Sequence, residues 1–241
     1  MFGRQKVAAL FAEFLGTGVL TLLILNVKIS SLGGLSLFVA MTAALAYVIM
    51  SFAVGSKSGG YFNPALTLGA WTVRKISTAN AVFYVAFQLL GAWAAYYLYT
   101  YLVGSPLHTN VVLYNPHVLV AEIVGTGIFA FAFASAVYQG FSRAVSASVA
   151  GLGLLVGMVA ASSASLALLN PAVALGLRSW AWYTYVAGPV IGAVVGYNLY
   201  SFIFTESGLS KLAAVFSSSS TKTVVAKSAV TKNKSVSKKK K

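Results

Sequence analysis

Apolar residues lie in six long runs along the chain, separated by shorter polar segments. The runs cover about residues 7–27, 35–54, 79–103, 118–138, 144–164 and 182–204. Each run reaches the ~20 residues that a helix needs to cross the hydrocarbon core of a bilayer. We therefore predict an all-α membrane protein with six transmembrane helices.

Two further apolar stretches are too short to span a bilayer. Residues 64–73 follow the second long run, and residues 171–177 follow the fifth. Hydrophobic segments of this length are typical of re-entrant or buried half-helices. We expect one half-helix in each stretch.

The chain also contains an internal repeat. The pattern Ala-Glu-x-x-Gly-Thr-Gly begins at Ala12 and again at Ala121, and Asn-Pro-Ala-x-x-x-Gly begins at Asn63 and again at Asn170. Each half therefore has three spans and one half-helix in the same order. Because three is odd, the second half must enter the membrane from the opposite side. This predicts an inverted repeat whose functional centre lies at the midplane.

The two Asn-Pro-Ala turns have the composition of helix starts. Asn is a favoured N-cap, and Pro suits the first helical position because its missing N–H has no partner there. Inverted symmetry brings both N-termini, the positive ends of the helix dipoles, to the midplane. The Asn amides can donate to a passing water, whereas a cation or a hopping proton meets a positive barrier. The residues of this predicted centre are Asn63, Pro64, Ala65, Asn170, Pro171 and Ala172.

Four motifs extend these turns into a recognisable pattern. They are Ser-Gly-Gly-Tyr-Phe-Asn-Pro-Ala at 58–65, Gln-Leu-Leu-Gly-Ala at 88–92, Leu-Asn-Pro-Ala at 169–172 and Gly-Pro-Val-Ile-Gly-Ala at 188–193. With them the chain resembles the aquaporins, the major intrinsic protein family of water and small-solute channels, over roughly residues 5–204.

The resemblance implies a right-handed six-helix bundle with two half-helices, a pore through each monomer and a homotetramer. It also implies that Glu13 and Glu122 bind backbone groups of the re-entrant loops. That role agrees with the high cost of an unpaired carboxylate inside a membrane. We prefer this structural role to a proton relay.

The chain departs from the resemblance at the outer constriction. Aquaporins usually build this filter from an aromatic residue, a His or small residue, a loop position and an Arg directly after the second Asn-Pro-Ala. The family spacing puts these positions at Ala43, Met158, Ala167 and Val173. Because Val replaces Arg and Ala replaces the aromatic residue, we expect an outer gate that is apolar and wider than usual.

Two neighbouring residues bear on this gate. Arg178 lies ~140° around and ~7.5 Å along the half-helix from Val173, so we do not expect it to replace the missing Arg. Glycerol-conducting relatives usually carry Asp at the position of Ala174, which argues against a glycerol facilitator.

Composition narrows the classes of function. Hydrophobic residues make up 59% of the chain and charged residues 8%, against roughly 45–50% and 25% in soluble domains. The absence of cysteine excludes disulfide frameworks, thiolate metal sites and cysteine nucleophiles. His108 and His117 lie in or beside an outer loop. We expect no metal, no cofactor and no enzymatic activity.

The net charge of +14 is unevenly distributed. If both termini are cytoplasmic, fifteen of the 17 Lys and Arg residues lie inside, and only Lys28 and Arg178 lie outside. Cytoplasmic loops carry an excess of Lys and Arg, so we predict this orientation.

The last 37 residues, 205–241, contain nine lysines and nine serines. Such a segment cannot bury enough apolar surface to fold, so we predict a channel domain at 1–204, with repeat halves at about 7–103 and 118–204, and a disordered basic cytoplasmic tail. The tail suits anionic lipid headgroups. Its single aromatic residue, Phe216, gives none of the alternation of basic and aromatic residues that favours nucleic-acid binding. Lys238 and Lys239 match a dilysine retrieval signal, so the predicted location is the plasma membrane, or the endoplasmic reticulum in a eukaryote.

The sequence is compatible with three functions. The first is a passive channel for water and other small neutral solutes that excludes protons and cations. The second is a channel mainly for ammonia, peroxide or polyols through a widened apolar filter. The third is an ion-coupled transporter, since such proteins also use inverted repeats and broken helices, although only Glu13 and Glu122 offer ionisable groups for coupling.

Overall fold

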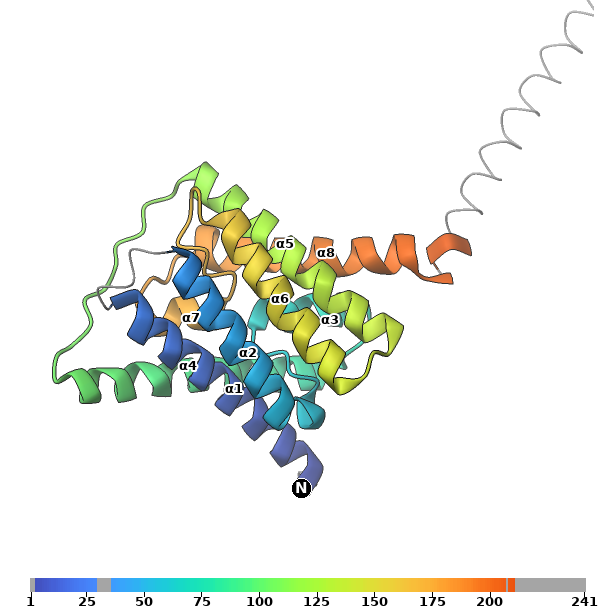
Figure 1. The fold of residues 1–241 in the computed structure, drawn as a ribbon, viewed down its shortest axis with the longest axis horizontal. Coiled ribbons are helices and arrows are strands. Elements are labelled where there is room, and N and C mark those ends of the chain that lie inside the picture. The colour runs from blue at the N-terminus through green and yellow to red at the C-terminus, as the bar shows by residue number, and fades with distance from the viewer. Residues whose placement is uncertain (1–2, 30–35, 207, 211–241) are drawn as a thin grey trace, which may run out of the picture. The chain divides into compact units, whose positions relative to one another are not determined.

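The computed structural model describes residues 3–29, 36–206 and 208–210, and all regular structure in these residues is helical (Figure 1). In chain order the helices are α1 (Arg4–Ile29), α2 (Ser36–Ser58), α3 (Pro64–Thr72), α4 (Thr78–Val103), α5 (Pro116–Gln139), α6 (Arg143–Ala161), α7 (Pro171–Gly176), the π-helix η2 (Trp182–Ala187) and α8 (Gly188–Phe204).

Six helical segments of the described residues are long and apolar enough to cross a membrane. They are α1, α2, α4, α5, α6 and the continuous segment of η2 and α8. This confirms the predicted all-α fold class with six spans. The observed ends differ from the predicted ones by a few residues. For example, α2 continues past residue 54 to Ser58, because polar side chains are tolerated at a helix end, and it stops before Gly59, whose φ is +103°.

The two short helices are α3 and α7, and they are buried among the longer ones (Figure 1). The helix α3 contacts α4, α5 and α7, while α7 also contacts α1 and α4. Two half-helices from opposite halves of the sequence therefore meet inside one bundle.

Glycines let the long helices approach closely. A Cβ built on Gly157 of α6 would collide with the carbonyl of Gly125 on α5. On α8, Gly192 lies against the carbonyl of Ile123 and Gly196 against that of Gly127. Small residues at such crossings replace hydrophobic burial as the source of helix association in lipid.

The chain divides into two compact units, residues 1–200 and 201–241. The helices and half-helices above belong to the first unit, apart from the last turn of α8. The predicted tail begins inside the second unit, and most of it, residues 211–241 with both dilysine positions, lies outside the described residues. The predicted boundary at residue 204 stays a prediction.

Candidate functional site

Each half-helix begins at the Asn of an Asn-Pro-Ala turn. The Oδ1 of Asn63 accepts a hydrogen bond from the N–H of Ala65 at 2.8 Å. The Oδ1 of Asn170 accepts from the N–H of Ala172 at 3.0 Å and from that of Val173 at 3.4 Å. Both prolines occupy the start of the helix, where an N–H would have no intrahelical partner. The side-chain oxygens are thus used for capping, and the amide N–H groups remain as donors.

The two Asn side chains bind across the repeat. The Nδ2 of Asn63 donates to the carbonyl oxygen of Leu169 at 2.8 Å, and the Nδ2 of Asn170 donates to that of Phe62 at 3.0 Å. The structure therefore brings the N-termini of α3 and α7 together. Each Asn thus uses one of the two N–H donors of its carboxamide for the opposite loop.

The residue before each Asn has an unusual backbone conformation. Phe62 has a φ of +46° and Leu169 a φ of +50°, both in the left-handed region. This conformation costs a non-glycine residue about 1–2 kcal/mol. It directs each carbonyl oxygen toward the Asn of the other loop, so the cost is offset by the two cross-repeat hydrogen bonds.

Glu13 of α1 supports the first of these loops. Its Oε1 accepts from the N–H of Tyr61 at 3.1 Å, and its Oε2 accepts from the N–H of Phe62 at 2.7 Å. The Nε2 of Gln88 also donates to Oε2, at 2.6 Å. The carboxylate is completely buried, and these donors replace water around it.

Glu122 of α5 repeats the arrangement in the second half. It accepts from the N–H of Leu168 at 3.0 Å, from the N–H of Leu169 at 2.8 Å and from the hydroxyl of Ser165. In each half, then, the carboxylate binds the two residues that precede the Asn. Both carboxylates fix the left-handed residue rather than face the space between the half-helices.

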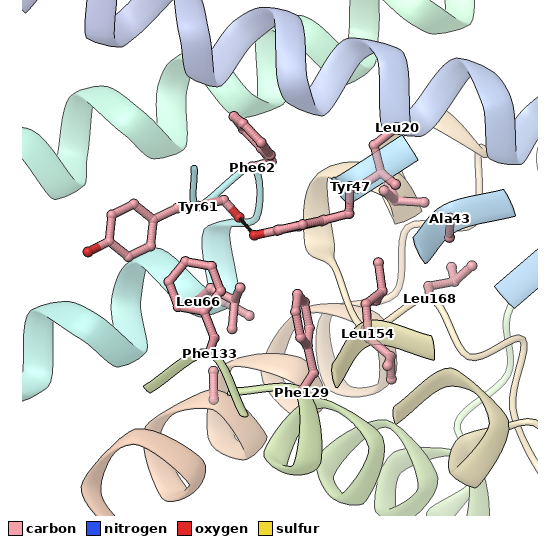
Figure 2. Packing of buried hydrophobic residues seen from close by; sticks show 14 of the residues in the cluster. Leu20, Ala43, Tyr47, Tyr61, Phe62, Leu66, Phe129, Phe133, Leu154 and Leu168 are labelled. Atoms are coloured by element: carbon pink, nitrogen blue, oxygen red, sulfur yellow. Dashed lines mark hydrogen bonds between the residues drawn. The ribbon is translucent and has the colours of Figure 1, made fainter. Parts of the chain in front are cut away.

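Two of the four predicted filter positions line a cavity at the N-terminal end of α2 and the C-terminal end of α6, which we call the outer cavity after the predicted orientation. Met158 and Ala167 line this cavity of about 180 Å³, together with Val39, Ser162 and Ser165. Ala43 and Val173 are completely buried. Ala43 belongs to a buried cluster with Leu154 and Leu168 (Figure 2). The wider outer gate stays a prediction.

Lys28 also lines the outer cavity, although no sequence pattern placed it near the predicted filter positions. Lys28 lies in the last turn of α1 and lines the same outer cavity as Met158 and Ala167. It also interacts electrostatically with Glu122. The position of a cation in the last turn of the first span was the signal, but the sequence cannot tell which way that turn faces.

Arg178 has contacts of its own at the end of α7. Its Nη2 donates to the hydroxyl of Thr109 at 2.8 Å, and its guanidinium lies over the rings of Trp93 at 5.9 Å and Tyr96 at 5.5 Å. These contacts hold the guanidinium against α4 and the loop after it. They agree with the expectation that Arg178 does not replace the missing Arg at position 173.

A second cavity lies at the other ends of α2 and α6. It has a volume of about 210 Å³ and is lined in part by Ser51, Gly55, Phe133 and Ala147. Tyr47 lies on α2 between the residues that line the two cavities, and its hydroxyl donates to the loop before Asn63. No sequence pattern singled out this residue.

Comparisons with known proteins agree with this architecture. The sequence model of the major intrinsic protein family matches residues 3–200. Aquaporin AqpM of Methanothermobacter thermautotrophicus is 30% identical over 236 residues, which cover 84% of this chain and 96% of that protein. The probable aquaporin TIP3-2 of Oryza sativa subsp. japonica is 36% identical over 188 residues, covering 73% of this chain and 70% of that protein.

A solved structure shares the fold. The aquaglyceroporin from Plasmodium falciparum matches with a TM-score of 0.71 over 82% of this chain and 96% of that chain, at 22% identity. Identity this low supports the fold alone. With its six apolar spans, the family match over most of its length and the aquaporin relatives, the chain belongs to the major intrinsic protein family of membrane channels.

Proposed function

We propose that the protein is a passive transmembrane channel that conducts water and excludes protons and cations at its paired Asn-Pro-Ala turns. The observation that carries this proposal is the reciprocal bonding of Asn63 and Asn170. It fixes two amide donors at one point, where the N-termini of α3 and α7 meet.

The electrostatics of that point favour a neutral acceptor. Each helix N-terminus carries roughly half a positive elementary charge, and each Asn adds an N–H. A water molecule at this point accepts hydrogen bonds from the Asn N–H groups with its oxygen, and its two hydrogens point away from them. Because its lone pairs are occupied, it cannot accept a proton from a neighbouring water. A cation meets only donors. The site therefore passes water and opposes cations and hopping protons.

The buried acids keep this arrangement rigid. Glu13 and Glu122 accept from backbone N–H groups of the residues before each Asn. Their roles are structural, and this argues against an ion-coupled transporter, because coupling needs an ionisable group that the solute path can reach.

The outer gate combines an apolar filter with a cation on its rim. Ala43, Met158, Ala167 and Val173 offer no side-chain N–H or O–H donors to a solute. Lys28 lines the cavity at Met158 and Ala167, so its ammonium opposes cations at the position where the Arg at 173 is absent. The lack of donors supports ammonia and peroxide as further small solutes, whereas Ala174 argues against glycerol.

Assembly and orientation complete the proposal. The chain forms a homotetramer with a pore in each monomer, and both termini are cytoplasmic. The inner ends of the spans then carry most of the Lys and Arg of the channel domain, in accord with the positive-inside rule. The basic tail binds anionic headgroups of the adjacent leaflet, and its last lysines direct retrieval to the endoplasmic reticulum if the source is eukaryotic.

The function is tested by reconstitution of the purified protein into liposomes. Stopped-flow measurements follow the entry of water, ammonia, peroxide and glycerol. We expect water permeability above that of empty liposomes and no glycerol flux. If water permeability equals that of empty liposomes while ammonia or peroxide passes, the protein is a channel for those solutes instead. Saturable flux that depends on an ion gradient would indicate a transporter.

A further inference from the structure

We infer that Tyr47 forms the narrowest point of the pathway and limits both the rate of water flow and the size of the solute. The inference rests on the proposed channel function and adds a residue that selects solutes at mid-depth rather than at the outer filter. It follows from the position of Tyr47 on α2, from the packing of its ring and from the bonds of its hydroxyl.

One face of α2 runs along the pathway. Val39 lines the outer cavity, and Ser51 and Gly55 line the inner one. Residues four apart on a helix lie above one another, so Ala43 and Tyr47 occupy the same face between the two cavities. They are 0% and 1% exposed.

The helix α6 has the same order. Met158 lines the outer cavity together with Ser162, the residue after the helix, while Ala147 and Ala150 line the inner one. Leu154 lies between these pairs and is buried. Figure 2 shows the ring of Tyr47 pointing from α2 toward the backbone of Tyr61. Side chains of both helices therefore fill the segment of the pathway that separates the cavities.

Aromatic rings surround Tyr47 in this segment. Its ring centroid lies 5.4 Å from that of Phe129 in an edge-to-face arrangement, 5.5 Å from that of Phe62 and 6.5 Å from that of Phe133 (Figure 2). These are ordinary distances for favourable aromatic pairs. These contacts hold the ring in one packed position.

The hydroxyl of Tyr47 occupies the acceptors that a conducted water would use. It lies 2.7 Å from the carbonyl oxygens of both Gly60 and Tyr61, in the loop that leads to Asn63. Non-helical backbone at membrane depth needs either protein or pathway water to satisfy its polar groups. Because a tyrosine hydroxyl carries a single O–H, these two carbonyl oxygens share that one donor. A conducted water reaches them only when the Tyr47 hydroxyl turns away.

The position of the Tyr47 ring also explains why Ala43 stands where aquaporins usually have an aromatic filter residue. The filter lacks its aromatic residue at position 43, and an aromatic residue occurs one helical turn further in, ~6 Å along the axis. The constriction has therefore moved from the outer mouth toward the paired Asn residues. The apolar outer filter then has little effect on which neutral solutes pass, because they are selected at Tyr47.

Two substitutions separate the ring from its hydroxyl. Tyr47→Phe keeps the packing and releases the carbonyls of Gly60 and Tyr61. We expect water permeability to rise about fivefold, the factor that one ordinary hydrogen bond is worth in an equilibrium, with glycerol still excluded. Tyr47→Ala removes the ring, and we expect a larger rise in water permeability together with glycerol flux that the wild type lacks.

The matched control is Tyr84→Phe. The Tyr84 hydroxyl also donates to this loop, at the carbonyl oxygen of Ser58 at 3.2 Å, but it comes from α4. We expect its water and glycerol permeability to equal those of the wild type. Size-exclusion chromatography identifies variants that have lost their fold, and the near-isosteric Tyr47→Phe keeps the test decisive if Tyr47→Ala fails to fold.

The outcomes separate a failure of the Tyr47 constriction from a failure of the proposed channel function. If the wild type conducts and folded Tyr47→Phe or Tyr47→Ala matches its water and glycerol permeability, Tyr47 is not the constriction, while the channel function stands. If every folded variant equals empty liposomes for all solutes, the channel function itself is wrong, and the inference falls with it.

Discussion

Single residues at the centre of the protein repeat their roles across the two halves. Glu13 and Glu122 bind the same two backbone positions in each loop, and Asn63 and Asn170 bind each other's loops. The sequence repeat was sufficient to predict that these residues correspond. It was not sufficient to predict the reciprocal bonds, because those depend on the left-handed conformation of Phe62, which no side-chain pattern signals.

The carboxylates can be tested by Glu13→Gln and Glu122→Gln. An amide has one acceptor oxygen where the carboxylate has two, and the bonds lost are charge-assisted. We expect each variant to lose about 2–3 kcal/mol of unfolding free energy, with similar values for the two because each carboxylate accepts from the two backbone N–H groups that precede its Asn. Denaturant unfolding in detergent measures the loss.

The control for this pair is Glu206→Gln, because Glu206 is exposed and belongs to the second unit. Its stability should equal that of the wild type. Unchanged stability in Glu13→Gln would show that the loop does not need a carboxylate.

Lys28 can be tested through cation leak. Removal of a unit charge ~4 Å from a passing cation is worth about 1 kcal/mol even in water, or about fivefold in rate. We therefore expect Lys28→Met to raise sodium leak about fivefold, and Val173→Arg in the same background to reverse the rise. Sodium efflux from liposomes gives the measurement. Lys6→Met, at the other end of α1, is the control, and an equal rise in that variant would refute the role of Lys28.

At the scale of elements, hydrophobic runs predicted the helices well and side-chain directions poorly. The half-helices α3 and α7 follow from apolar stretches that are too short to span, each opened by Asn-Pro. By contrast, Tyr47 is one aromatic residue among many in an apolar run. Its position on the pathway depends on the rotation of α2 against α6, which tertiary packing sets. Lys28 escaped prediction for the same reason.

Helix contacts can be tested at Gly157. A methyl group on this residue would meet the carbonyl of Gly125 across the α5–α6 crossing. We expect Gly157→Ala to cost about 1–3 kcal/mol, the usual cost of overpacking, and to lower the temperature at which the detergent-solubilised protein unfolds. Gly3→Ala is the control, since a Cβ there would meet no atom within 4 Å. Equal stability of the two variants would contradict the close crossing.

At the scale of the whole molecule, the absence of cysteine allows a direct test of orientation. Single cysteines are introduced as Gly3→Cys before α1 and Val111→Cys in the loop between α4 and α5. The proposed orientation exposes position 3 to the cytoplasm and position 111 to the outside. An impermeant maleimide applied to intact cells should label Val111→Cys only, and permeabilised cells should label both. Labelling of Gly3→Cys in intact cells would reverse the orientation.

The central claim is that the paired Asn residues admit water and reject protons. Osmotic water permeability and proton permeability, measured in the same proteoliposomes, test it most directly. We predict that the wild-type protein raises water permeability above that of empty liposomes and leaves the proton leak unchanged. Water permeability equal to that of empty liposomes, or a proton leak that rises together with water flow, would contradict the account.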